Sequence, residues 1–328
     1  MISVAVTDRR SPVLARSSLP CLRQTATINL TAGCAHGCLY CYTRGYRHYP
    51  GDGRVTLYRN ALERLRDELG RQRDRLAAVY LSPSSDLFQP VPQVLEMTYQ
   101  VLAFLLERGI PIAFLTKGRI PNRHMQLLSA HAPLVHAQVG LVTLADEILH
   151  LFEPRAADAQ QRLRQIRELI QAGIETGVRV DPILPGFTDD QLSLRRLVAE
   201  VTGCGVKALA ASTLFLRPAV TAGLRRGLPA GQFTRLVSAF AAPDCVRIRP
   251  DGGWFQAMST VNRRRIYDRL GAIAAEFGIR AKICACKNPG FAAGACGIAG
   301  EPPVCGATSL PLFPDPPPQC GLADAYGN

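Results

Sequence analysis

Short apolar segments alternate with amphipathic segments of helical period along most of this chain, and this alternation restricts the fold more than any other feature. Buried strands joined by helices favour a parallel sheet, because a parallel connection needs a long crossover. The pattern predicts six β–α units. Their strands are expected at 25–31, 76–82, 111–117, 137–143, 177–184 and 206–216. Their helices are expected at 56–72, 92–108, 121–131, 157–172, 190–202 and 229–240.

Polar side chains follow the C-terminal ends of these strands, where a βα barrel assembles its site. They are Ser84, Ser85, Asp86, Thr116, Lys117, Thr143 and Asp181. Six units predict an incomplete barrel that is open on one side. We therefore expect an α/β fold, a partial (β/α)6 TIM-like barrel with a small, irregular, cysteine-rich C-terminal lobe. The expected division is an N-terminal arm at 1–20, the partial barrel at 21–245 and a C-terminal extension with a cysteine cluster at 246–328.

Length and charge narrow the class of protein. With 328 residues, 47% of them hydrophobic, the chain can bury a sizeable core. A formal net charge of +12 suits phosphate-rich partners such as nucleic acid. Scattered arginines on solvent-facing helix surfaces would explain the same charge without any partner. No apolar run approaches the roughly 18 residues of a membrane span, and the N-terminal stretch lacks the apolar core of a secretion signal. We expect a cytoplasmic protein with no membrane partner.

Three cysteines, Cys34, Cys38 and Cys41, lie close together directly after the first predicted strand. Iron–sulfur clusters are held by cysteine thiolates, and a four-iron cube normally takes four of them. Glycines beside the cysteines let the backbone fold tightly around a cluster. A structural zinc site that includes His36 and a set of ordinary buried thiols are the alternatives.

The C-x3-C-x2-C spacing, placed after a strand and followed by an aromatic residue, resembles the signature of radical S-adenosylmethionine (SAM) enzymes. The resemblance implies that Cys34, Cys38 and Cys41 hold a [4Fe-4S] cluster whose fourth iron is left open for SAM. It also implies that an electron from the reduced cluster cleaves SAM to give a 5'-deoxyadenosyl radical, which takes hydrogen from a substrate. Tyr40 and Tyr42 would then pack around the cluster or relay an electron or hydrogen. The expected partners are SAM and a one-electron reductant such as flavodoxin or ferredoxin.

Further segments between about 27 and 187 resemble the spore photoproduct lyase branch of this superfamily. "GCAHGCLYCYTRG" is similar to the cluster loop of that branch, and "SPSSD" at 82–86 is similar to its S-C-T-S-D segment, which approaches SAM. "LTKG" makes Lys117 a candidate partner for the methionine carboxylate. "FEPR" and "PILPGFTDD" resemble the E-P-x-R and P-I-x-P-G-x-x-D segments of the relatives.

The candidate cofactor-binding residues follow from these segments. They are Tyr42, Ser84, Ser85, Asp86, Lys117, Gln138, Ile183 and Gly186. Ile183 and Gly186 would border the adenine. Because Gly140 stands where the relatives usually carry a serine, a ribose contact is either lost or supplied by Gln138.

One departure concerns the substrate. Spore photoproduct lyase carries a hydrogen-donating cysteine where this chain has Pro83, and a proline has no thiol hydrogen to return to a product radical. The enzyme class, lyase or transferase, is therefore open. Nucleic acid is the leading substrate class. The alternative substrates are a small molecule, a peptide and a thiolate-bound metalloid. The alternative to an enzyme is a non-catalytic iron–sulfur or zinc sensor.

A second group of cysteines follows residue 283. Cys284, Cys286, Cys296 and Cys305 are the preferred ligands of a C-terminal metal site, with Cys320 as a further candidate. The surrounding glycines and prolines favour loops that wrap a metal. A second iron–sulfur cluster, a zinc or other thiophilic ion, and free thiols are all compatible with this pattern.

Overall fold

The computed structural model describes residues 2–17, 20–22, 25–71, 76–247, 253–285, 287–288 and 290–291. The largest sheet has the strand order β14-β10-β9-β8-β7-β6-β3-β2. These strands are β2 (Ala15–Arg16), β3 (Ala26–Ile28), β6 (Val79–Leu81), β7 (Ile112–Thr116), β8 (Val135–Gly140), β9 (Glu175–Ile183), β10 (Ala208–Thr213) and β14 (Arg280–Ile283). All neighbours pair in parallel except β2, which is antiparallel to β3. Because β14 and β2 have one neighbour each, the described strands form an open, partial barrel, as predicted.

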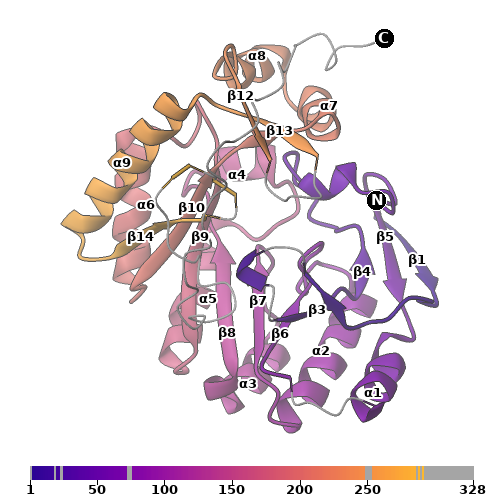
Figure 1. Cartoon of the computed structure of the whole chain (residues 1–328). Helices are drawn as coiled ribbons and strands as arrows, with labels where there is room; N and C mark the ends of the chain where they lie inside the picture. The colour runs from indigo at the N-terminus through magenta and orange to yellow at the C-terminus, as the bar shows by residue number, and fades with distance from the viewer. Residues whose placement is uncertain are drawn as a thin grey trace, which may run out of the picture.

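The described helices lie on the outer side of this sheet or at one end of it (Figure 1). They are α1 (Ala61–Arg71), α2 (Pro92–Glu107), α3 (Asn122–Ala130), α4 (Asp146–Phe152), α5 (Ala159–Gln171), α6 (Gln191–Gly203), α7 (Pro218–Gly227), α8 (Ala230–Ser238) and α9 (Thr260–Glu276). Short 3-10 helices lie at Pro20–Leu22, Tyr42–Gly45 and Ala132–Leu134. Figure 1 shows α1, α2, α3, α5, α6 and α9 around the outside of the curved sheet.

Local sequence explains where the helices begin and why they dock. The Asp158 carboxylate caps α5 by accepting a hydrogen bond from the Gln161 backbone N–H at 2.6 Å, in a capping box. Helix α2 begins at Pro92, a residue suited to the first turn because its missing N–H is not needed there. The same helix buries Leu102 and Leu105 completely. Each such side chain contributes about 1.5–3 kcal/mol, so packing rather than helix propensity holds α2 on the sheet.

Two small sheets flank the main one. In the first, β5 (Arg54–Tyr58) pairs with β1 (Ser3–Thr7) in parallel and with β4 (Thr31–Ala32) in antiparallel fashion. In the second, β13 (Trp254–Ala257) lies between β11 (Phe215–Leu216) and β12 (Asp244–Arg247). Figure 1 shows β12, β13, α7 and α8 grouped at one end of the main sheet.

The structure corrects the sequence prediction in two places. The helix expected at 56–72 begins only at Ala61, because residues 54–58 form β5, whose Val55 and Leu57 alternate into the interior. The main sheet also has a seventh parallel strand, β14, beside β10. Beyond residue 291, the cysteine-rich lobe expected at the C-terminus lies outside the described residues. None of the helices described is long and apolar enough to cross a membrane.

Candidate active site

The three-cysteine loop follows β4 and is fixed at its backbone from two sides. The Ala35 N–H donates to the Oε1 atom of Gln89 at 2.9 Å, and the Leu39 N–H donates to the Phe152 carbonyl at 2.9 Å. Gln89 is fully buried, and its amide also donates to Thr31 Oγ1 at 3.1 Å. The loop is therefore held by segments that follow β6 and β8, far away in the sequence.

Arg155 is a second anchor of the same loop. Its Nε donates to the Ala35 carbonyl at 2.5 Å, its backbone N–H donates to the His36 carbonyl at 3.2 Å, and its own carbonyl lies 3.1 Å from His36 Nδ1. A Cβ atom at Gly37, which has φ +68°, would lie 2.4 Å from Arg155 Nη2. Glycine is needed there for the left-handed backbone conformation and for the close approach of the guanidinium.

The thiols of Cys34, Cys38 and Cys41 act on one another electrostatically within this loop. Burial, followed by the charge of Asp86, raises the pKa of Cys34 well above its ordinary value. Burial, followed by the charge of Glu153, raises the pKa of Cys38 to about 12. In the part of the chain that is described, no three His, Cys, Asp or Glu side chains converge on one point as ligands of a single ion. A cluster differs from a single ion because each of its irons takes a separate thiolate. A positive centre shared by the three sulfurs would keep them ionised, so this donor set fits an iron–sulfur cluster.

Asp86 joins the loop to the ends of β6 and β7. Its carboxylate accepts hydrogen bonds of 2.8 Å from the Phe88 N–H, the Thr116 hydroxyl and the Lys117 N–H. It also lies 3.2 Å from His36 Nε2. Burial alone would raise the pKa of Asp86, but His36 and the hydrogen bonds outweigh it and lower the pKa. Through these contacts the Asp86 carboxylate holds His36 of the cysteine loop against the ends of β6 and β7.

Unlike the Asp86 carboxylate, some of the serine hydroxyls beside it have no hydrogen-bond partner among the described residues. The Ser84 N–H donates to Asn29 Oδ1 at 2.9 Å. The hydroxyl oxygens of Ser82 and Ser85 are buried and have no hydrogen-bond partner among the described residues. Ser82 also has φ +54°, a backbone conformation that is rare outside glycine. Buried hydroxyls without partners and local backbone strain are typical of ligand-binding segments.

Lys117 lies in a buried network with Tyr40 and Glu153. Its Nζ is 2.6 Å from the Tyr40 hydroxyl, 2.8 Å from Glu153 Oε1 and 3.3 Å from the Asp181 carbonyl. The Tyr40 hydroxyl donates to Glu153 Oε1, and Arg162 donates to Glu153 Oε2. Burial would raise the pKa of Glu153, but the charges of Arg162 and Lys117 outweigh it and hold the pKa at about 2. The ammonium group predicted to bind a carboxylate therefore already faces a carboxylate of the protein.

The other candidate residues lie on β8, at the end of β9 and beyond it, and in the 3-10 helix after Cys41. Gln138 is buried on β8, and Ile183 is buried at the end of β9. The Gly186 N–H donates to Asp189 Oδ1 at 2.8 Å. Tyr42 is 42% exposed and its hydroxyl donates to the Pro83 carbonyl. The hydrogen bonds of the structure thus connect Tyr40, Lys117 and Asp86 with the cysteine loop, and they place Tyr42 against the "SPSSD" segment.

The predicted C-terminal ligands are represented by one residue. Cys284 is 2% exposed and packs with Leu22, Tyr80, Ala113 and Ala210. Cys286, Cys296 and Cys305 lie outside the described residues.

Several positioning residues escaped the sequence prediction, namely Gln89, Glu153, Arg155 and Arg162. Arg162 offered a signal, because it occupies the apolar face of α5 between Ala159 and Ile166 and is completely buried. A charged residue in such a stripe requires a buried counter-charge. Glu153 and Arg155 belong to the "FEPR" segment, whose resemblance to the relatives gave no role for either side chain.

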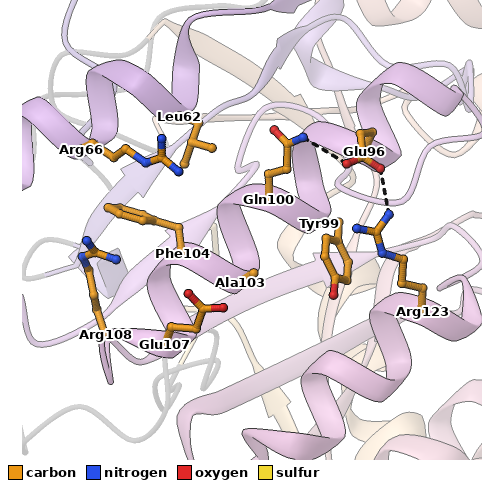
Figure 2. Close-up of a pocket in the computed structure, with 10 residues that line it drawn as sticks. All are labelled: Leu62, Arg66, Glu96, Tyr99, Gln100, Ala103, Phe104, Glu107, Arg108 and Arg123. Carbon is orange, nitrogen blue, oxygen red and sulfur yellow. Dashed lines mark hydrogen bonds and ion pairs between the residues drawn. The ribbon is translucent and has the colours of Figure 1, made fainter.

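A groove of about 690 Å³ on the outer helical face is separate from this site. It is lined by residues of α1, α2 and α3, and Figure 2 shows Arg123 reaching Glu96 across it. None of the cysteines or strand-end residues lines the groove, so its size does not identify it as the reaction site.

Comparison with known proteins agrees with this geometry. The Radical SAM superfamily model matches residues 28–198, more than half of the chain, and the protein belongs to this superfamily. Membership implies a [4Fe-4S] cluster, SAM and a source of single electrons.

Two relatives and one solved structure illustrate the likeness. The chain is 30% identical over 200 residues to the radical SAM Nalpha-GlyT isomerase of Pseudomonas phage M6, covering 60% of this chain and 41% of that protein. It is 30% identical over 200 residues to an uncharacterized protein of Mycobacterium tuberculosis (strain ATCC 25618 / H37Rv), covering 58% of this chain and 59% of that protein. The aligned region therefore spans less than two thirds of either relative. Spore photoproduct lyase complexed with dinucleoside spore photoproduct matches the fold with a TM-score of 0.66 and 15% identity, covering 86% of this chain and 82% of that one.

Proposed function

We propose that this protein is a radical SAM enzyme that takes a hydrogen atom from a nucleoside within nucleic acid. The observation that carries the proposal is the three-thiol loop, which is anchored rigidly by Gln89 and Arg155 and offers three protein sulfurs to a cluster that has four irons. When bound, the cluster and SAM supply a 5'-deoxyadenosyl radical. The chain itself holds this chemistry in one place and limits the access of water.

The residues at the strand ends would divide the work of binding. Cys34, Cys38 and Cys41 would hold the cluster. The hydroxyls of Ser84 and Ser85, together with Lys117, Gln138, Ile183 and Gly186, would contact SAM. Glu153 holds the Lys117 ammonium in place, so that the methionine carboxylate of SAM could share it.

The choice of nucleic acid rests on three kinds of support. The relative from phage M6 is named as an isomerase of Nalpha-GlyT, and the solved lyase was studied with a dinucleoside. The chain carries a formal charge of +12. Near the site, Tyr42 is exposed, and Trp254 on β13 is 42% exposed with the Arg247 guanidinium 5.3 Å from its ring centre. Exposed aromatics next to arginines suit stacking against unpaired bases.

The lyase reaction itself is not proposed. Pro83 stands where spore photoproduct lyase carries its hydrogen-donating cysteine, and Pro83 presents a carbonyl to Tyr42. Transfer of a thiol hydrogen from this position is therefore impossible in this chain.

Anaerobic reconstitution with iron and sulfide tests the proposal. We expect release of 5'-deoxyadenosine after reduction in the presence of SAM, and loss of this product in the Cys38→Ala variant. Deuterium supplied on the nucleosides of an oligonucleotide should appear in 5'-deoxyadenosine. Binding of the oligonucleotide should weaken by about tenfold or more between 50 and 200 mM salt, because counterions are released when phosphates are contacted.

Two results would contradict the proposal at different levels. A reducible cluster that never yields 5'-deoxyadenosine would exclude the radical chemistry. Formation of 5'-deoxyadenosine without deuterium from any oligonucleotide, single-stranded or duplex, would exclude the nucleic-acid substrate.

A further inference from the structure

Helix α7 packs directly on the cysteine loop. It contacts the 3-10 helix Tyr42–Gly45 that follows Cys41. A Cβ atom at Gly223 would lie 3.1 Å from the carbonyl oxygen of Leu39, and one at Gly227 would lie 2.4 Å from Leu39 Cδ2. Leu39 stands between Cys38 and Cys41 in the sequence, so α7 packs against the loop through Leu39 and the Arg44 side chain.

The surface made by α7 and the 3-10 helix is strongly basic. Arg225 and Arg226 are exposed in the last turn of α7. Arg217, at the other end of the helix, has its guanidinium carbon 3.4 Å from the position of a Cβ atom at Gly45. Arg44, whose side chain is only 6% exposed, completes the group from below the surface. We call this group the α7 basic patch: Arg44, Arg217, Arg225 and Arg226. The carboxylate of Asp52 pairs with two of its members, Arg44 and Arg226.

Arg44 links this patch to the loop. One nitrogen of its guanidinium pairs with Asp52 at the surface, and the other, Nη2, donates to the Cys38 carbonyl at 3.2 Å. A single side chain therefore extends from the exposed carboxylate to the backbone of a candidate cluster ligand.

From this arrangement we propose that the α7 basic patch docks an acidic one-electron donor protein of the flavodoxin or ferredoxin kind. The inference rests on the proposed function, because it presupposes a redox centre at Cys34, Cys38 and Cys41. One electron leaves the donor, which is oxidised by one unit, and the centre held by the three thiols is reduced by one unit. No bond forms or breaks. Among the described residues the patch gathers four guanidinium groups, two of which pair with Asp52, so it complements an acidic surface. Such complementarity mainly accelerates and orients encounter.

The experiment compares charge reversal in the patch with the same change elsewhere. The test variant is Arg225→Glu/Arg226→Glu, which substitutes no residue of the cysteine loop, and cluster reduction by dithionite shows whether the loop is intact. The matched control is Arg195→Glu/Arg196→Glu, an adjacent pair of exposed arginines on α6 with one member bound to a carboxylate, Glu276. Reconstituted full-length proteins are titrated into an acidic flavodoxin at low ionic strength, with the anisotropy of the flavin fluorescence as the readout. Stopped-flow absorbance then follows cluster reduction by flavodoxin and by dithionite.

We expect the test variant to bind flavodoxin at least about tenfold more weakly than the wild type and to be reduced by it correspondingly more slowly. Reduction by dithionite should be unchanged in both variants, and the control should retain wild-type affinity. Equal flavodoxin affinity in the wild type and the test variant would overturn the inference, as would an equal loss in the control. Weaker oligonucleotide binding with unchanged flavodoxin binding would also overturn it and assign the patch to nucleic acid. The affinity does not depend on turnover, so failure of the radical chemistry would be recognised separately by the absence of 5'-deoxyadenosine.

Discussion

At Gly140 the absence of a side chain determines where Lys117 lies. A Cβ atom at this position would be 2.9 Å from Lys117 Cγ and 3.1 Å from its Cε. The Gly140 carbonyl accepts a hydrogen bond of 2.7 Å from Arg162, whose guanidinium also binds Glu153. Gly140 thus makes room for the lysine stem, and its carbonyl helps to position Arg162, the buried counter-charge of Glu153.

Glu153→Gln tests how much the fold depends on this network. The substitution keeps the shape of the side chain but leaves the buried Arg162 and Lys117 cations without their counter-charge, so we expect the free energy of unfolding to fall by about 3 kcal/mol. Urea unfolding of the cluster-free chain followed by circular dichroism measures the change. Glu168→Gln, an exposed position on the same helix as Arg162, is the control and should stay within about 0.5 kcal/mol of the wild type. If the free energy of unfolding of Glu153→Gln fell by less than about 1 kcal/mol, solvation of the Arg162 and Lys117 cations would have replaced the lost counter-charge.

At the scale of elements, sequence periodicity predicts all six β–α units, because both faces of the parallel strands are buried and the helices between them are long. It misses β14, since four residues after a long helix resemble any short apolar run. It also begins the first helix at residue 56 instead of Ala61, because the short strand β5 lies only a few residues before α1 in the sequence. The strand-end rule brings Asp86 and Lys117 to the cysteine loop. It cannot foresee Gln89 or Arg155, whose roles arise from loops that meet only in the folded chain.

Gly37→Ala tests whether the cysteine loop needs its glycine in order to bind iron. An alanine would have to hold φ near +68° and would clash with the Arg155 guanidinium, which binds the Ala35 carbonyl. We expect iron bound per chain after reconstitution to fall at least about twofold. Gly70→Ala, in the exposed last turn of α1 with open space around its Cα, should load like the wild type and be slightly more stable. Wild-type iron content in Gly37→Ala would mean that the loop adapts without its glycine.

For the molecule as a whole, the positions of its charges matter more than their sum. The outer groove of Figure 2 and the α7 basic patch both contain arginines, but only the patch connects through Arg44 to the cysteine loop. The arginines beside the groove lie against aromatic rings, as Arg108 does at 3.9 Å from the centre of the Phe104 ring. They therefore cover apolar surface as well as carrying charge. The arginine content of the sequence does not show which arginines cover apolar surface and which lie near the cysteine loop. The fold shows this, because it places the α7 basic patch beside that loop.

Acid stability of the whole protein is expected to depend on Asp181, which connects β9 with the segment after β14. Its carboxylate binds Lys287 at 2.6 Å and Arg179 at 3.0 Å. Burial would raise the pKa of Asp181, but the charges of Lys287 and Arg179 outweigh it and lower the pKa to about 2. Because the folded-state pKa lies below the ordinary value of 3.8, the folded chain binds this proton less readily than the unfolded chain. The resulting stability is complete above the unfolded pKa and is lost as pH falls through the folded pKa.

We expect the free energy of unfolding to decline from about pH 5 towards pH 2 in the wild type. In Asp181→Asn it should be lower by about 2 kcal/mol at pH 7 and decline less steeply. Urea titrations at several pH values measure this, with Asp67→Asn on the exposed face of α1 as the control. Parallel profiles for the wild type and Asp181→Asn would show that the three-charge contact does not contribute to acid stability.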